Sequence, residues 1–159
     1  MNPNKLTTKA QEALQSMLSL AREKGQQSLE ADHLLRVLLD QSESVVPATL
    51  QKIGVSIPNL IRETDQSLSK LPQVSGGEPY TSRELLSILD QAESLAKGLQ
   101  DEYTSTEHLL LALSKSENTD AGKRLRKAGA TSDAILKALT DVRGAHRVTD
   151  QRYWFSHSP

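Results

Sequence analysis

The sequence contains no cysteine in its 159 residues, and this absence excludes disulfide bonds, thiolate catalysis and cysteine-ligated zinc. Aromatic residues are scarce, at one Phe, one Trp and three Tyr. Nineteen Lys and Arg against 20 Asp and Glu leave a net charge of −1, so no overall field attracts nucleic acid or an anionic membrane. The apolar run at 109–113 is too short for a transmembrane helix or a secretory signal. We therefore expect a soluble, cytoplasmic domain.

Leucine and alanine dominate the composition and together far outnumber valine and isoleucine. Unbranched side chains favour helices, while β-branched and aromatic side chains, which suit pleated sheets, are few. The composition therefore predicts an all-α fold.

The chain repeats itself at an ungapped offset of 75 in the numbering. Eleven positions are identical at this offset, and they include the string His33-Leu34-Leu35, which recurs as His108-Leu109-Leu110. Such self-similarity indicates an internal duplication. Apolar residues follow helical spacing in both copies. They predict four helices per copy, at 8–24, 31–40, 44–53 and 57–70, and at 83–98, 106–115, 119–128 and 132–142.

Residues that begin and end helices recur at the same offset. Hydroxyl side chains stand at four expected helix starts, namely Thr7, Ser56, Ser82 and Thr131. Gly54 and Gly129 stand just after apolar stretches, where a left-handed residue ends a helix. These repeated caps support the two four-helix repeats, which we expect to be pseudo-symmetric.

Composition divides the chain into five parts. They are a first repeat at 1–71, a Pro- and Gly-rich connector at 72–80, a second repeat at 81–144, the start of a linker at 145–151, and a tail at 152–159. The tail holds three of the five aromatic residues and is either foreign to the natural protein or a natural adhesive segment. Because four short helices bury little surface, we expect the repeats to pack on each other and leave a shallow seam for binding.

The residues contain no recognisable site for nucleotides or metals. No glycine-rich loop has phosphate-binding spacing, and the four histidines are too scattered for a metal. His33 and His108 each follow an acid, Asp32 or Glu107, which raises the idea of an acid–base dyad. Neighbours on a helix diverge by about 100°, so we favour a helix start whose acid suits the dipole. The basic residues at 123–127 lack interleaved aromatics, which favours a solvated face over a nucleic-acid site.

Several stretches together resemble the duplicated N-terminal domain of Clp ATPases, most closely that of the ClpB disaggregases. The stretches are Leu6-Thr7, 32–35, 71–74, 106–113 and 142–148. The resemblance covers about residues 1–151. It implies a substrate-recognition and regulatory domain that binds exposed apolar segments of unfolded or aggregated proteins and helps deliver them to the pore of a hexamer. It also implies that ATP and Mg belong to absent ATPase rings, so this fragment needs no cofactor and is not itself an enzyme.

The resemblance further implies partners and a groove. The full-length proteins are homohexamers that work with the DnaK chaperone system, whereas an isolated domain is expected to be a monomer. Matching the family positions one at a time places Thr7, Asp101 and Glu107 at a substrate-peptide groove. The family's groove is apolar, and we expect Leu89, Leu95 and Leu109 to line it here. The main alternative is an adaptor-docking domain like that of ClpC or ClpA. A third alternative, an autonomous enzyme, would need a hidden site among Asp32, His33, Glu107 and His108.

Overall fold

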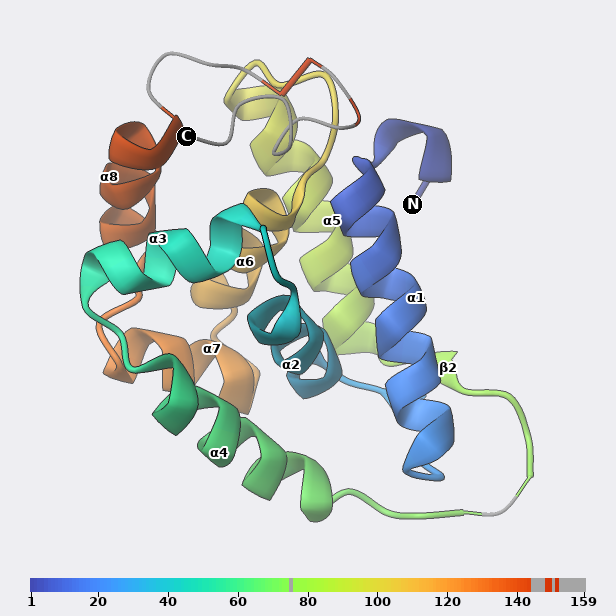
Figure 1. Ribbon diagram of the computed structural model, residues 1–159. Coiled ribbons are helices and arrows are strands. Elements are labelled where there is room, and N and C mark those ends of the chain that lie inside the picture. The colour runs from blue at the N-terminus through green and yellow to red at the C-terminus, as the bar shows by residue number, and fades with distance from the viewer. Residues whose placement is uncertain (75, 144–147, 150, 152–159) are drawn as a thin grey trace.

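Eight α-helices form the part of the chain that the computed structural model describes, which is residues 1–74, 76–143, 148–149 and 151 (Figure 1). Their bounds are α1 Thr8–Glu23, α2 Ala31–Asp40, α3 Val45–Ile53, α4 Ile57–Ser69, α5 Arg83–Gly98, α6 Thr106–Lys115, α7 Asp120–Lys127 and α8 Ser132–Arg143. A 3₁₀ turn at Pro3–Lys5 and two strands, β1 Ser28–Leu29 and β2 Tyr80–Thr81, complete the elements. The predicted all-α fold is confirmed, and every predicted helix end lies within one residue of the observed end. The aromatic tail lies outside the described residues.

The predicted helix caps are present. The hydroxyl oxygen of Thr7 accepts a hydrogen bond from the N–H of Ala10, and that of Ser82 accepts one from Leu85. Ser56 and Thr131 do the same for Asn59 and Ala134. Gly54 and Gly129 follow α3 and α7 with φ of 96° and 99°, in the left-handed region that favours glycine.

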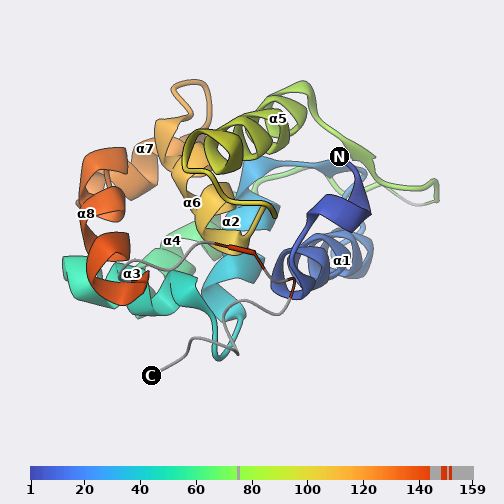
Figure 2. The same ribbon diagram turned by 90° about the horizontal axis from the view of Figure 1, so that it is seen from above.

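The two repeats share one hydrophobic core. Its centre is the pair α2 and α6, which the other helices surround (Figure 2). Every residue from Thr106 to Ser114 in α6 is buried, and Leu34, Leu35 and Leu38 of α2 are fully inaccessible. Helices also pack across the duplication, since α3 lies on α8 and α4 contacts α7. The expectation that the two copies pack on each other is therefore confirmed.

Two short parallel pairings tie each repeat to the other. In β1 and β2, Leu29 pairs with Thr81, and an isolated bridge joins Leu6 to Thr104. These pairings are equivalent, because Thr104 is the repeat equivalent of Leu29 and Thr81 is the repeat equivalent of Leu6. The start of each repeat's first helix is thus held by the loop after the first helix of the other repeat. As a result, α1 and α5 run in opposite directions with one pairing at each end.

Candidate functional site

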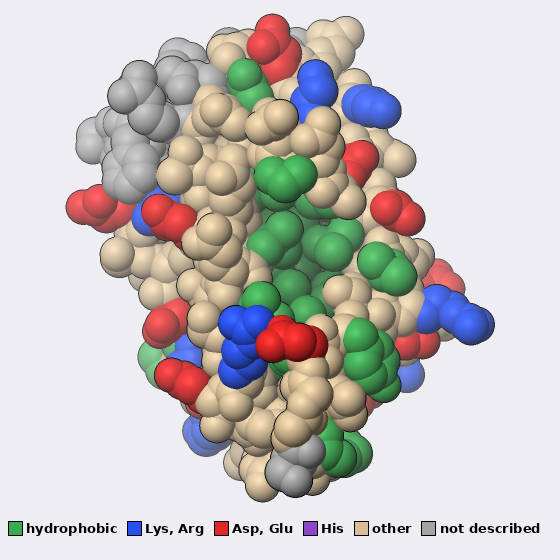
Figure 3. All heavy atoms as spheres, turned by 90° about the vertical axis from the view of Figure 1, so that its right-hand side faces the viewer, with side chains coloured by type: hydrophobic (Ala, Val, Ile, Leu, Met, Phe, Trp, Pro, Cys, Tyr) green, Lys and Arg blue, Asp and Glu red, His purple; other side chains and the backbone are tan. Residues whose placement is uncertain are grey.

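A shallow hollow lined with hydrophobic side chains opens on the face that carries α1 and β2 (Figure 3). We call it the α1/α5 groove. Helices α1 and α5 form its walls, the two strand pairings close its ends, and α2 and α6 lie beneath, since α1 packs on α2 and α5 packs on α6. The pseudo-symmetry of the repeats therefore builds one groove where their first helices face each other.

The wall residues of α1 follow from helix geometry. Leu14 and Leu18 are partly buried, and each comes one position after a buried residue, whereas Leu20 comes one position before buried Ala21. Because one position is about 100°, Leu20 lies on the opposite flank from the other two. Leu20 lines a cavity with residues of α2 and α4. The flank of Leu14 and Leu18 therefore faces the groove.

The same helix geometry puts the two predicted groove leucines of α5, Leu89 and Leu95, on opposite flanks of that helix. Leu89 and the half-exposed Leu86 each come one position after a buried residue, whereas Leu95 comes one position before buried Ala96. Leu89 is the repeat equivalent of Leu14, and Leu95 is the equivalent of Leu20. Leu86 and Leu89 therefore lie on the flank of α5 that faces α1, and Leu95 lies on the opposite flank.

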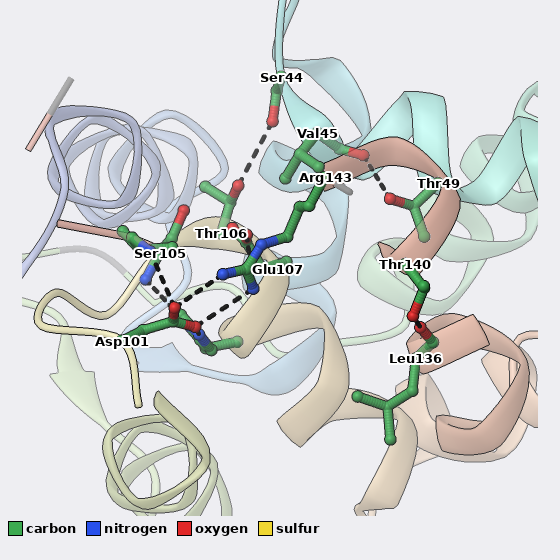
Figure 4. Close-up of polar contacts among 12 residues, drawn as sticks. Ser44, Val45, Thr49, Asp101, Ser105, Thr106, Glu107, Leu136, Thr140 and Arg143 are labelled. Atoms are coloured by element: carbon green, nitrogen blue, oxygen red, sulfur yellow. Dashed lines mark hydrogen bonds and ion pairs between the residues drawn. The ribbon is translucent and has the colours of Figure 1, made fainter. Parts of the chain in front are cut away.

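Asp101, in the loop between α5 and α6, accepts hydrogen bonds from three directions (Figure 4). Oδ2 lies 2.7 Å from Nε2 of His108, and Oδ1 lies 2.7 Å from Nη2 of Arg143 and 2.8 Å from the backbone N of Val148. The N–H of Ser105 donates to Nδ1 of His108 at 2.8 Å, so the ring proton is on Nε2, where it is donated to Asp101. Asp101 thereby connects α6, α8 and the segment after α8.

Burial of Asp101 by itself would raise the pKa of its carboxyl. The hydrogen bonds from His108, Arg143 and Val148, together with the positive charge of Arg143, outweigh this effect and lower the pKa from 3.8 to about 2. The carboxylate is therefore ionised at neutral pH and acts as the anionic centre of a buried polar cluster.

Glu107, in the first turn of α6, is fully buried. Neither of its carboxylate oxygens accepts a hydrogen bond from a described residue, and Nη1 of Arg143 lies 3.5 Å from Oε2. Arg143 extends from α8 between Asp101 and Glu107 (Figure 4). The guanidinium of Arg143 and the positive end of the α6 dipole therefore both lie beside the carboxyl group of Glu107.

Thr7 and Leu109 are buried as well, at 2% and 0% exposure. Thr7 caps α1, and its N–H donates to the carbonyl of Thr104 at the end of the groove. Leu109 lies in the core on α6. The structure thus places Thr7, Asp101 and Glu107 beneath the surface near one end of the groove, and Leu109 in the core. Direct contact between these side chains and a peptide stays a prediction.

The sequence did not identify the partners of the two histidines. His33 bonds to Gln26 at 2.7 Å, and His108 bonds to Asp101, so each imidazole pairs with the residue seven positions before it rather than with the acid next to it. Gln26 and Asp101 occupy equivalent positions in the two repeats, which is the signal that could have revealed them. Burial lowers the pKa of His33 against the opposing charges of Glu30 and Asp32.

The basic residues of α7 do not form one solvated face. Nη1 of Arg124 lies 2.6 Å from Oδ1 of Asp32, and Nη1 of Arg126 donates to the carbonyls of Ser114 and Ser116 at 2.7 Å. Among these basic residues, only Lys123 and Lys127 are exposed. The interpretation of 123–127 as a solvated face was therefore wrong for the two arginines, because each finds oxygen acceptors on neighbouring helices.

Metal sites and membrane spans were sought in the described part of the chain. No group of three or more His, Asp or Glu side chains is placed to hold a metal ion there. Among the same residues, every helix falls short of the length and apolarity needed to cross a membrane.

Comparison with known proteins gives consistent matches along the chain. Residues 5–143 match the family described as Clp repeat (R) N-terminal domain. The chain is 40% identical over 151 residues to the chaperone protein ClpB of Porphyromonas gingivalis and 37% identical over 151 residues to that of Bacteroides thetaiotaomicron. Each match covers 95% of this chain but only 17% of the relative, so the chain spans a small part of the length of these proteins.

Solved structures share the fold. The Hsp104 N-terminal domain from Candida albicans matches with a TM-score of 0.81 at 19% identity, covering 93% of this chain and 97% of that one. A complex of the ClpV N-domain with a VipB peptide matches with a TM-score of 0.70 at 22% identity, covering 86% of both chains. At these identities the likeness establishes the fold alone.

Proposed function

The chain belongs to the Clp repeat (R) N-terminal domain family, and on this premise we propose that it captures exposed apolar segments of unfolded or aggregated polypeptides in the α1/α5 groove. The observation that carries the proposal is the hollow of hydrophobic side chains between two antiparallel helices (Figure 3). Misfolded chains differ from native ones in exposing such segments. The peptide-bound N-domain of ClpV supports a peptide as the kind of ligand for this fold.

The wider role belongs to the same proposal. The domain would form part of an ATP-driven disaggregase of the ClpB type, with ATP and Mg bound by rings outside this chain. In a homohexamer, six such domains would present weak sites around a pore. Cooperation with the DnaK system would belong to a middle domain outside this chain. A shallow site and a flexible ligand suggest a Kd of ~10 µM to ~1 mM for one domain. Multivalency would offset this weakness while allowing release.

Leu86 and Leu89 provide the test. We expect the double variant Leu86→Ser, Leu89→Ser to bind a permanently unfolded apolar polypeptide about tenfold more weakly, because it removes apolar contact area from one wall of the groove. Binding is followed by NMR titration of amide resonances along α1 and α5. Leu136→Ser is the matched control, since Leu136 is another exposed leucine and lies on α8.

Thermal unfolding of each variant shows whether the fold is intact. Equal binding by the groove variant and the control would contradict the groove assignment. A complete lack of binding by the unmodified chain at millimolar polypeptide would instead favour docking of a folded adaptor, as in ClpC or ClpA.

A further inference from the structure

The outer edge of β2 lies at the end of the α1/α5 groove where α5 begins (Figure 1). The N–H of Tyr80 points to β1 and donates to the carbonyl of Gln27 at 2.7 Å. The N–H of Ser82 also points to β1 and donates to the carbonyl of Leu29 at 3.0 Å. Because successive residues of a strand turn their backbone groups to opposite edges, the N–H and C=O of Thr81 point away from β1. Neither group forms a hydrogen bond with a described residue, and Thr81 is partly exposed.

The equivalent edge at the other end of the groove is closed by the chain itself. Leu6 is the repeat equivalent of Thr81 and forms the other strand pairing. Its N–H donates to the carbonyl of Pro3 at 3.1 Å. Its carbonyl accepts hydrogen bonds from Nε2 of Gln11 and from Nε2 of Gln151, both at 3.1 Å. The two ends of the groove therefore differ, since only the backbone groups of Leu6 have partners within the described chain.

The position of Gln11 shows that these edges face the groove. Gln11 comes one position after a buried residue, as Leu14 does, so it lies on the flank of α1 that faces the groove. From this flank its side chain reaches the carbonyl of Leu6. Leu86 is the repeat equivalent of Gln11 and is 51% exposed on the corresponding flank of α5. By this pseudo-symmetry the carbonyl of Thr81 also faces the groove, but Leu86 has no hydrogen-bonding group with which to cap it.

The two free groups of Thr81 fit one kind of ligand. A residue of an extended chain can exchange both hydrogen bonds with Thr81, as opposed residues do in antiparallel strands. A helical ligand cannot do this, because its own N–H and C=O groups bond to each other. Every non-proline residue of an unfolded polypeptide offers the required donor and acceptor. The edge is therefore complementary to an extended backbone of any sequence.

We propose that the α1/α5 groove binds its polypeptide in extended form, with one ligand residue paired to Thr81 as a third strand beside β2. The proposal rests on the proposed function and names the conformation of the segment that the groove accepts. Side chains of an extended ligand alternate between two faces, so the groove favours segments with apolar residues at every second position. Pairing through the backbone adds affinity that does not depend on the ligand's sequence.

Substitution of Thr81 tests the pairing. Proline is tolerated at a strand edge where the N–H has no partner in the sheet, so Thr81→Pro removes the free donor. We expect it to bind a permanently unfolded apolar polypeptide about three- to tenfold more weakly, the effect of one hydrogen bond. Thr81→Val is the matched control, because it keeps the N–H and the shape of the side chain, and its affinity should be unchanged. Far-UV circular dichroism checks both folds.

The unmodified chain provides a second measurement that needs no variant. In an NMR titration with a short apolar peptide, the amide proton of Thr81 should move downfield and exchange more slowly with water at saturation. A copy of the peptide that is N-methylated at every residue keeps the side chains but lacks backbone donors, and it should bind about three- to tenfold more weakly.

Equal affinities of Thr81→Pro and Thr81→Val, or an unchanged Thr81 amide at saturation, would overturn the proposal. A peptide bound as a helix would also overturn it. If Leu86→Ser, Leu89→Ser weakens binding while Thr81→Pro does not, the groove remains the binding site and only the strand pairing is wrong. If neither change affects binding, the proposed function fails together with the pairing.

Discussion

At the scale of residues, each repeat pairs a buried histidine with a polar side chain, but the two repeats use different side chains for this. In the first repeat, Nε2 of Gln26 donates to the carbonyl of Leu68 while its Oε1 pairs with His33. In the second, Asp101 takes the place of Gln26, and Arg143 takes the place of Leu68. A neutral amide pairing has thus become a charged pairing. Charge-assisted hydrogen bonds are stronger than neutral ones, and loss of one partner of a buried charged pair lowers the free energy of unfolding more.

This difference predicts the effect of Asp101→Asn. We expect the substitution to lower the free energy of unfolding at pH 7 by about 2 kcal/mol, because the pKa of Asp101 is about 2 in the folded state against an ordinary value of 3.8. Urea unfolding measures the change. Glu102→Gln is the matched control, since Glu102 is the exposed neighbour and should change stability by less than about 0.5 kcal/mol.

The same pKa difference sets a pH dependence. Because the folded state holds Asp101 at a lower pKa, its contribution is complete above pH 3.8 and is lost as the pH falls toward about 2. The free energy of unfolding of the unmodified chain should therefore fall more steeply in this window than that of Asp101→Asn. Parallel curves for the two proteins would contradict the assigned role of the carboxylate.

At the scale of elements, the close approach of α7 to the end of α6 depends on one glycine. A Cβ at Gly122 would lie 2.2 Å from the carbonyl oxygen of Ser116 and 2.8 Å from that of Leu113. Both are backbone atoms, which cannot swing aside. The position of α7, and of Arg124 and Arg126 on it, therefore requires the absence of a side chain at residue 122.

Gly122→Ala should accordingly destabilise the domain by about 2 kcal/mol or more, because backbone must shift to admit the methyl group. Gly98→Ala is the matched comparison, since Gly98 ends α5 and its Cβ would meet nothing within 4 Å. At residue 98 the better helix propensity of alanine should raise the free energy of unfolding by up to about 1 kcal/mol. Thermal unfolding distinguishes the two signs, and a neutral Gly122→Ala would refute the tight approach.

At the scale of the whole molecule, the repeats are joined by charge as well as by the core. Asp32 on α2 pairs with Arg124 on α7 and also accepts a hydrogen bond from Ser67 on α4 at 2.6 Å. The side chains of Asp32 and Arg124 are only 11% and 13% exposed. Their interaction links α2 of the first repeat to α7 of the second, across the duplication.

We expect Arg124→Ala to lower the free energy of unfolding by about 2 kcal/mol, because it leaves a mostly buried carboxylate with one partner fewer. Unfolding should remain a single transition by fluorescence and circular dichroism, since both repeats contribute to one core. The exposed Lys127 on the same helix supplies the control Lys127→Ala. Separate transitions for the two repeats would contradict the shared core.

Much of the fold was predictable because helix formation is local. The spacing of apolar residues and the caps, such as Thr7 and Ser82, each depend on only a few neighbouring residues. The sequence therefore predicted every helix end to within one residue. The internal repeat also predicted two equivalent halves that pack together. The candidate site was predictable only in part. Asp101 and Glu107 were predicted as groove acids, but their burial against Arg143 depends on how the last residue of α8 reaches the loop before α6.

The sequence by itself determined the helices, their caps and the duplication, because these depend on local spacing and on side-chain chemistry read along the chain. The tertiary structure alone decided which flank of each helix faces the groove and which acids lie beneath the surface. Leu89 and Leu95 are both leucines of the same helix, but they lie on opposite flanks of α5. Leu89 follows a buried residue, whereas Leu95 precedes one. Which of these flanks faces the groove is decided by the antiparallel arrangement of α1 and α5. That arrangement is fixed by the pairings of Leu6 with Thr104 and of Leu29 with Thr81.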